Sequence, residues 1–218
     1  MGRGDQRNAR SAVPARERGR LVSTVLVWEA SRGRRPLQLG RMSVRVGFLR
    51  AVNLGRRRVP MTRLVAVCES LGYADVWTYV NSGNVVFDTT GARASVEAAM
   101  QQALEDEFGF ECTTFVRTAK QVSSVLDARP FPLAAGDTHF VTFLKKAPST
   151  SDAKRLEALS NDFDTLVVHG AQVHWRMRGR STDSHLGKRD WEQVLGPVST
   201  TSRNVTMLTK LVAKLDAA

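Results

Sequence analysis

The chain has 218 residues, of which 32 are Lys or Arg and 21 are Asp or Glu, so its formal net charge is +11 at neutral pH. With 42% hydrophobic residues it is too apolar for a wholly disordered protein, and its longest apolar run, near 25–28, is far shorter than the ~20 residues of a membrane-spanning helix. Both classes are therefore excluded. Two cysteines are too few for a disulfide framework and suit a reducing compartment, so we expect a cytoplasmic protein.

Residues 1–41 differ in composition from the rest of the chain. They contain ten Arg, no Lys and three acidic residues, a net charge of +7, which leaves +4 for residues 42–218. A secretory or organelle-targeting signal fits only in part, because the apolar stretch is short and acidic residues interrupt the Arg-rich run. A basic arm for nucleic acid is a further alternative. We expect a disordered extension, translated from upstream of a true start at Met42.

Regular periodicity begins near Val44. Alternation of apolar residues predicts strands, apolar faces repeating every three to four residues predict helices, and a polar Gly-containing turn predicts a hairpin. The predicted elements are, in order, a strand at 44–50, a helix at 60–71 that ends at Gly72, hairpin strands at 76–80 and 85–87, a helix at 96–108 that ends at Gly109, and a strand at 113–116. The order β-α-β-β-α-β is that of the ferredoxin-like unit.

The second half of the chain repeats part of this pattern. Its predicted elements are a helix that starts with a capping box at Thr118 and Gln121, a strand at 139–144, a helix at 152–159, hairpin strands at 166–168 and 173–175, and a last helix at 205–215 capped by Thr200, Thr201 or Ser202. The echo of Phe48-Leu49-Arg50 in Phe143-Leu144-Lys145 is weak evidence for duplication. We predict an α+β fold of two ferredoxin-like βαββαβ-type halves with antiparallel sheets, about 42–117 and 118–218, plus a C-terminal helix.

Four short strings carry a resemblance to a known family. They are VGFLRAVNLG at 46–55, VPM at 59–61, YVNSGNVVF at 79–87 and TSRN at 201–204. In this order they resemble the bacterial family of domain of unknown function 1697, over essentially all of 42–218. The resemblance implies an α+β fold of two ferredoxin-like halves and no specific chemistry. The sequence departs from the family pattern in its arginine triplet at 56–58 and in Ser202 and Val205.

The first candidate site is the loop after the first predicted strand. Arg50, Asn53 and Gly55 lie where a strand ends and a helix begins, and backbone N–H groups and the helix dipole bind anions at such places. The alternative is a structural loop, in which Asn53 bonds to its own backbone and Gly55 supplies a positive φ. The spacing matches neither a phosphate loop nor a dinucleotide-binding fingerprint.

Two further candidates lie in the hairpin turn and before the last helix. Asn81 and Ser82 occupy the turn, where Ser82 is a candidate nucleophile and a plain hairpin is the alternative. Arg203 and Asn204 are expected to begin the last helix, where hydroxyls, free N–H groups and a guanidinium would meet an anion. The alternative there is simple N-capping, with Arg203 paired to a carboxylate.

A third cluster joins aromatic and basic side chains. Trp175 and Trp191 are interleaved with five basic residues, a pattern that can stack and track nucleic acid, although tryptophans in a small domain more often belong to the core. The basic residues are Arg176, Arg178, Arg180, Lys188 and Arg189.

Other motifs favour structural roles. The residues of 182–185 have triad types but are too close in sequence to form a triad. His169 and His174 have no accompanying ligand motif, and Cys68 lies on an apolar helix face, so we expect no metal and no cofactor.

These observations lead to one functional hypothesis with two rivals. The leading hypothesis is a protein that binds an anionic ligand, either a phosphorylated small molecule or nucleic acid, at the loop after the first strand and at the start of the final helix. The first rival is an enzyme that acts on a phosphorylated small molecule, with Arg50 and Arg203 as phosphate clamps. The second rival is a protein-interaction module.

Overall fold

The structure is a computed structural model that describes residues 42–55, 57–128, 130–197 and 200–217. The predicted Arg-rich extension, residues 1–41, lies outside the described residues. Both halves of the remaining chain belong to one compact unit, Leu39–Ala218.

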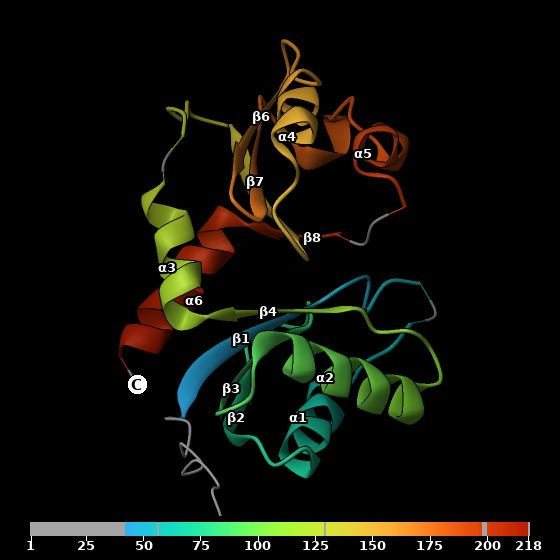
Figure 1. Ribbon diagram of the computed structural model, residues 1–218. Helices are drawn as coiled ribbons and strands as arrows, with labels where there is room; N and C mark the ends of the chain where they lie inside the picture. Colours follow the sequence, from blue (N-terminus) through green and yellow to red (C-terminus); the bar gives the residue numbers. More distant parts are fainter. Residues whose placement is uncertain (1–41, 56, 129, 198–199, 218) are drawn as a thin grey trace, which may run out of the picture. The chain divides into compact units, whose positions relative to one another are not determined.

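The first half contains six elements in the predicted order. They are β1 (Ser43–Leu49), α1 (Met61–Ser70), β2 (Ala74–Thr78), β3 (Asn84–Thr89), α2 (Arg93–Phe108) and β4 (Thr114–Thr118). The strands form an antiparallel sheet in the order β2-β3-β1-β4, and α1 and α2 lie on one face of it (Figure 1).

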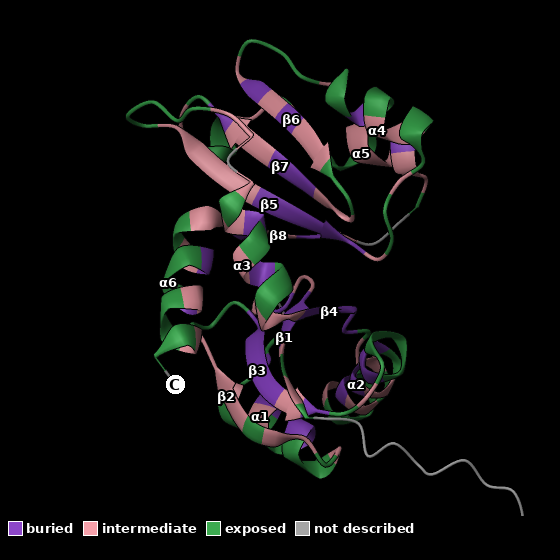
Figure 2. Ribbon diagram, turned by 60° about the vertical axis from the view of Figure 1, so that its left-hand side comes forward, coloured by how far each residue is buried: buried purple, intermediate pink, exposed green. Residues whose placement is uncertain are grey.

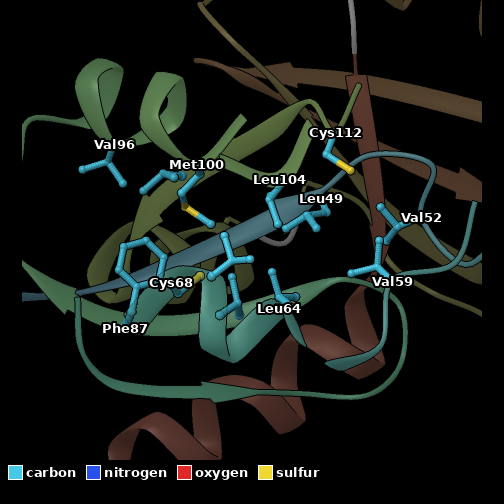
Figure 3. Packing of buried hydrophobic residues seen from close by; sticks show 13 residues of the cluster. Leu49, Val52, Val59, Leu64, Cys68, Phe87, Val96, Met100, Leu104 and Cys112 are labelled. Atoms are coloured by element: carbon cyan, nitrogen blue, oxygen red, sulfur yellow. The ribbon is translucent and has the colours of Figure 1, made fainter. Parts of the chain in front are cut away.

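Both faces of the first sheet are buried. Val85 and Phe87 of β3 point toward α1 and α2, whereas Val86 between them points to the opposite face. A strand covered on both sides has a continuous apolar run, as β3 does. Figure 3 shows how apolar side chains from β1, α1 and α2 converge in the first core; the labelled residues are Leu49, Val52, Val59, Leu64, Cys68, Phe87, Val96, Met100, Leu104 and Cys112.

The second half has the same element order. Its elements are β5 (Thr138–Leu144), α4 (Thr150–Glu157), β6 (Asp164–His169), β7 (Gln172–Met177), α5 (Lys188–Leu195) and β8 (Thr200–Asn204), with a short 3₁₀ turn, Ser181–Asp183, before α5. The strand order is β6-β7-β5-β8, again antiparallel. The predicted α+β fold of two βαββαβ-type halves is confirmed.

One additional helix follows each half. These helices are α3 (Ala119–Asp127), which follows β4, and α6 (Val205–Asp216), which follows β8. They lie side by side and, with the inner faces of both sheets, enclose a middle core (Figures 1 and 2). Phe48 of β1 stacks on Phe143 of β5 there, with ring centroids 4.6 Å apart. The predicted C-terminal helix is therefore part of the contact between the halves.

Two elements differ from the sequence prediction. No helix was expected at Lys188–Leu195, and Thr200–Asn204 was expected to cap and begin the last helix, whereas it forms the edge strand β8. The cap of α6 is Asn204, whose side chain accepts the Thr206 N–H at 2.8 Å. The reason is tertiary pairing: hydroxyl residues favour caps locally, but Thr201 and Ser202 find ladder partners on β5.

Within the described part of the chain, no helix has the length and apolar character to cross a membrane.

Candidate functional site

The two halves are structural repeats of seven elements. The series β1-α1-β2-β3-α2-β4-α3 recurs as β5-α4-β6-β7-α5-β8-α6, with the same strand order in each sheet. The strand registers match as well. Phe48 of β1 pairs with Phe115 of β4, and the equivalent Phe143 of β5 pairs with Thr201 of β8. Positions in the paired strands of one half therefore have equivalents in the other, and we align α2 with α5 from their first residues, Arg93 and Lys188.

A pair of equivalent buried arginines joins the halves. Arg117 of β4 donates to the Leu144 carbonyl at 2.5 Å and lies over the ring of Phe143, 5.4 Å from its centroid. Arg203 of β8 donates to the Leu49 carbonyl at 2.8 Å and lies 5.3 Å from the ring centroid of Phe48. Each arginine thus binds the end of the first strand of the other half.

Arg203 is held by acceptors on every side. Burial lowers its pKa to about 10, and among the described residues no carboxylate lies within ion-pair distance of it. Its guanidinium donates to Asn84 Oδ1 (2.5 Å), Thr201 Oγ1 (2.7 Å), and the carbonyls of Ser202 (2.9 Å), Leu49 (2.8 Å), Ser82 (3.2 Å) and Gly83 (3.3 Å). With this many acceptors already bound, Arg203 fastens the two halves together.

The repeat also produces two equivalent clefts, one of which is filled. This closed cleft lies between α2 and β4 and receives Lys145 from the end of β5. The Lys145 ammonium donates to Glu97 Oε2 at 2.9 Å, to Gln101 Oε1 at 2.9 Å and to the Thr114 carbonyl. The ammonium therefore finds all its partners within the protein.

The second cleft lies between α5 and β8 and receives Arg50 from the end of β1. Arg50 is equivalent to Lys145, and its guanidinium makes no hydrogen bond or ion pair with any other described residue. A hollow of about 210 Å³ is present here, and we call it the open cleft. It is lined by Arg50, Thr142, Trp175, Leu186, Gly187, Lys188, Trp191, Glu192, Gly196, Thr200 and Ser202.

Substitutions at equivalent positions explain why this cleft is open. Helix α5 ends at Leu195, and Gly196 with a φ of 71° stands where Gln101 stands in the longer α2. Glu192, equivalent to Glu97, pairs with Lys188 at 3.2 Å on its own helix. Its side chain is 36% exposed, compared with 9% for Glu97. In the open cleft, therefore, neither equivalent residue gives Arg50 a side-chain acceptor: Gly196 has no side chain, and the Glu192 carboxylate pairs with Lys188.

The edge strands show the same contrast in their backbone N–H groups. In β4 the outward-facing N–H of Val116 donates to Glu97 Oε1 at 2.8 Å, and that of Thr114 donates to Gln101 Oε1 at 3.2 Å. In β8 the equivalent residues are Ser202 and Thr200, because β8 pairs with β5 in the same register as β4 pairs with β1. In an antiparallel edge strand every second residue points its N–H away from the neighbouring strand, so these two N–H groups point outward as well. No described side chain accepts from either amide. Two backbone donors therefore face the open cleft.

The polar lining of the open cleft also has hydroxyl groups. Thr142 and Ser202 are hydrogen bonded through their hydroxyls at 2.8 Å, where the closed cleft has Gly47 opposite Val116. A second hollow of about 350 Å³ adjoins the open cleft through Arg50, Thr200 and Ser202 and extends toward the loop after β1. Arg50 stands where the two hollows meet.

The candidate residues from the sequence fall into separate groups. Arg50, Ser82 and Arg203 line the second hollow together. Asn53 and Asn81 line a different, shallow hollow; Asn53 donates to the Asn81 carbonyl at 2.7 Å and accepts the Val59 N–H at 2.9 Å. The structural alternative describes Asn53 well, since its side chain holds its own loop.

The remaining candidates have backbone roles in the structure. Gly55 is exposed with a φ of 56°, as the loop alternative expected. Asn204 caps α6 and lines neither the open cleft nor the second hollow. At the hairpin, Gly83 has a φ of 73°, and a Cβ there would lie 2.5 Å from Val52, so the turn packs tightly on the loop after β1.

Several residues of the open cleft were not predicted to join Arg50 in one site, although Lys188 and Trp191 belonged to the predicted aromatic and basic cluster and Thr200 and Ser202 to the predicted cap of the last helix. Thr142, Lys188, Trp191, Thr200 and Ser202 come from three elements of the second half. The sequence signal that points to them is the Phe-Leu-Arg and Phe-Leu-Lys echo. Aligning the halves on that echo places Arg50 opposite Lys145, and Glu192 is equivalent to Glu97 because each is the fifth residue of its helix.

The aromatic and basic cluster is divided between core and surface. Trp175 and Trp191 pack against the third apolar cluster, and Trp175 Nε1 donates to Asp164 Oδ1 at 2.8 Å. Arg176 donates to Thr165 Oγ1 at 2.6 Å. Both tryptophans also line the open cleft.

The histidines lie on the opposite face of the second sheet. His139 Nε2 and His174 Nδ1 are 3.2 Å apart, and the pKa of each is lowered to about 4, mainly by burial and further by a neighbouring imidazole. Across the described residues, no three side chains of the His, Cys, Asp or Glu type come together as a metal site would require. Burial also raises the pKa of Cys68 to about 12, which matches its predicted core role.

Comparison with known proteins assigns the family. The family model described as "Protein of unknown function (DUF1697)" matches residues 42–174. The chain belongs to this family. A solved structure, that of a conserved bacterial protein from Streptococcus pneumoniae, is similar with a TM-score of 0.60 and 18% sequence identity, covering 80% of this chain and 99% of the other. At that identity the likeness concerns the fold alone. No curated protein sequence matches the chain.

Proposed function

We propose that the protein binds a small anionic ligand in the open cleft, with Arg50 as the charged anchor. The observation that carries the proposal is the comparison of the two equivalent clefts. The closed cleft is filled by the chain's own carboxylate and ammonium, whereas the open cleft presents a guanidinium and two backbone N–H groups without those acceptors. An anion would supply what is missing.

The polar groups around Arg50 support the same reading. The Ser202 and Thr200 amides, the Thr142 and Ser202 hydroxyls and the Arg50 guanidinium all converge within one hollow. Donors fixed in a partly enclosed site bind anions more strongly than mobile surface groups do, because they lose less freedom on binding.

The other functions have less support. An enzyme acting on a phosphorylated small molecule needs an acid or base beside the reacting group. In the open cleft the Thr142 and Ser202 hydroxyls bond to each other, and the Glu192 carboxylate pairs with Lys188. Arg203, the second clamp of that hypothesis, is already engaged by carbonyls of its own fold. The nucleic-acid form is weakened because the two tryptophans are largely part of a core.

Thermal unfolding of the full chain in the presence of small anions tests the proposal. We expect the transition temperature to rise with the concentration of a bound phosphate, sulfate or carboxylate compound, because a ligand that binds only the folded state stabilises it. Arg50→Met should abolish the rise. Arg58→Met is the matched control, since Arg58 is an exposed arginine outside the open cleft, and it should leave the rise unchanged. Equal shifts in wild type and Arg50→Met would refute the site.

A further inference from the structure

We propose that the ligand of the open cleft is a small carboxylate that also carries an amide carbonyl and an apolar group, as an N-acylated aromatic amino acid does. The proposal rests on the proposed function, which places an anion in this cleft, and adds its chemical class. It follows from using the closed cleft as an internal template for what the open cleft lacks.

The template identifies the anion as a carboxylate. In the closed cleft one carboxylate oxygen of Glu97 accepts the Val116 N–H at 2.8 Å, and the other accepts from Lys145 Nζ at 2.9 Å. A two-oxygen anion thus bridges the strand edge and the base. The equivalent donors of the open cleft are the Ser202 N–H and the Arg50 guanidinium, and a guanidinium pairs with a carboxylate through two parallel hydrogen bonds.

Charge balance favours a single negative charge. Three charged side chains line the open cleft: Arg50, Lys188 and Glu192. Lys188 and Glu192 neutralise each other at 3.2 Å, so Arg50 is the one charge left to balance among the lining side chains. A phosphate dianion would bring a second negative charge close to the Glu192 carboxylate, which a carboxylate ligand avoids.

The template also indicates a neutral second acceptor. The amide oxygen of Gln101 accepts the Thr114 N–H at 3.2 Å in the closed cleft. Gly196, which has no side chain, stands in its place in the open cleft, and Thr200 presents the equivalent N–H. A ligand that replaces in the open cleft what Gln101 supplies in the closed cleft therefore brings an amide carbonyl to accept the Thr200 N–H.

The floor of the cleft selects an apolar group. Trp175, Trp191 and Leu186 line it, and Trp191 occupies the position of the smaller Val96 in the closed cleft. Aromatic rings pack well against tryptophan, and a hollow of about 210 Å³ has room for a small molecule only.

Tryptophan fluorescence provides the test, because two tryptophans line the cleft. The full chain is titrated with N-acetyl-L-phenylalanine, with the uncharged N-acetyl-L-phenylalaninamide, with phenyl phosphate and with an N-acetylated tetrapeptide that ends in phenylalanine. We expect saturable binding of N-acetyl-L-phenylalanine, at least tenfold weaker binding of the amide and of phenyl phosphate, and no gain for the tetrapeptide. Arg50→Met should lose the binding and Arg58→Met should keep it.

Each contrary result has a separate meaning. Tighter binding of phenyl phosphate, lost in Arg50→Met, would overturn the carboxylate assignment and leave the anion site intact. Equal binding of the amide would overturn the role of the carboxylate charge. Tighter binding of the tetrapeptide would overturn the assignment to a small molecule. Failure of every anion to bind, phenyl phosphate included, would overturn this inference together with the proposed function.

Discussion

The closed and the open cleft are the same place in two copies of one structural unit, and their chemistry differs. In the closed cleft Glu97, Gln101 and Lys145 satisfy one another and the edge of β4. In the open cleft a shortened helix leaves Arg50 and the edge of β8 without these partners. The difference shows that equivalent clefts of a repeated fold can differ in whether the chain's own side chains fill them.

The largest expected effect on stability comes from removing the arginines that join the halves. Arg203→Met removes the six hydrogen bonds of a buried guanidinium and leaves the buried Asn84 Oδ1 without that donor, so we expect the free energy of unfolding to fall by about 3–5 kcal/mol in urea titration. Arg117→Met removes two hydrogen bonds and a 3.9 Å contact with Glu97, whose carboxylate keeps Lys145 as a partner at 2.9 Å, and should cost about 2 kcal/mol. Equal losses in the free energy of unfolding for the two variants would contradict the expectation that the six hydrogen-bond acceptors of Arg203 determine how much it stabilises the protein.

The second prediction compares the two bases that enter the clefts. Lys145→Met leaves the largely buried Glu97 carboxylate without its ammonium partner, and we expect a loss of about 1–3 kcal/mol in the free energy of unfolding. Arg50→Met removes a side chain without protein partners and should stay within about 0.5 kcal/mol of wild type. Chemical denaturation of both variants measures the difference. A large loss for Arg50→Met would show that Arg50 is structural, as Lys145 is.

Much of the fold could be predicted because its signals are local. The strands, the capping box at Thr118 and the glycine stop at Gly109 are written in short segments, and the structure has them where expected. Strand β8 could not be predicted, because a Thr and Ser rich segment resembles a helix cap until β5 pairs with it. Arg50 and the cluster with Trp175, Lys188 and Trp191 were predicted as separate candidates. Their meeting in one cleft could not be predicted, because it depends on the register of two sheets, which no local pattern encodes.

A smaller difference between the halves, in the pH dependence of stability, is expected from the inner face of the sheets. Val86 of the first half is equivalent to His174 of the second, and burial lowers the pKa of His174 to about 4. Between pH 6.5 and 5.5 His174 becomes protonated in the unfolded chain but stays neutral in the folded protein. The free energy of unfolding therefore falls as the pH falls, by about 1 kcal/mol for one such group. His139 and His169 are the neighbouring imidazoles.

The variant that tests this effect is His174→Val, which copies the first half. Denaturation at pH 7.0, 6.5, 6.0 and 5.5 should show a shallower fall in the free energy of unfolding for the variant than for the wild type. The matched control is His185→Gln, because His185 lies outside this histidine group. An unchanged slope in His174→Val would contradict a depressed pKa at this position.

Amide hydrogen exchange resolved by residue is the most direct test of the proposal that the closed cleft is filled by the chain's own side chains and that the open cleft binds an anion. We expect slow exchange at Val116, whose N–H donates to Glu97, and fast exchange at the equivalent Ser202, with slowing at Ser202 when an anion binds. Thr201, which is bonded to β5, is the internal control. Equal protection of Val116 and Ser202 without ligand, or no change at Ser202 with a bound anion, would contradict it.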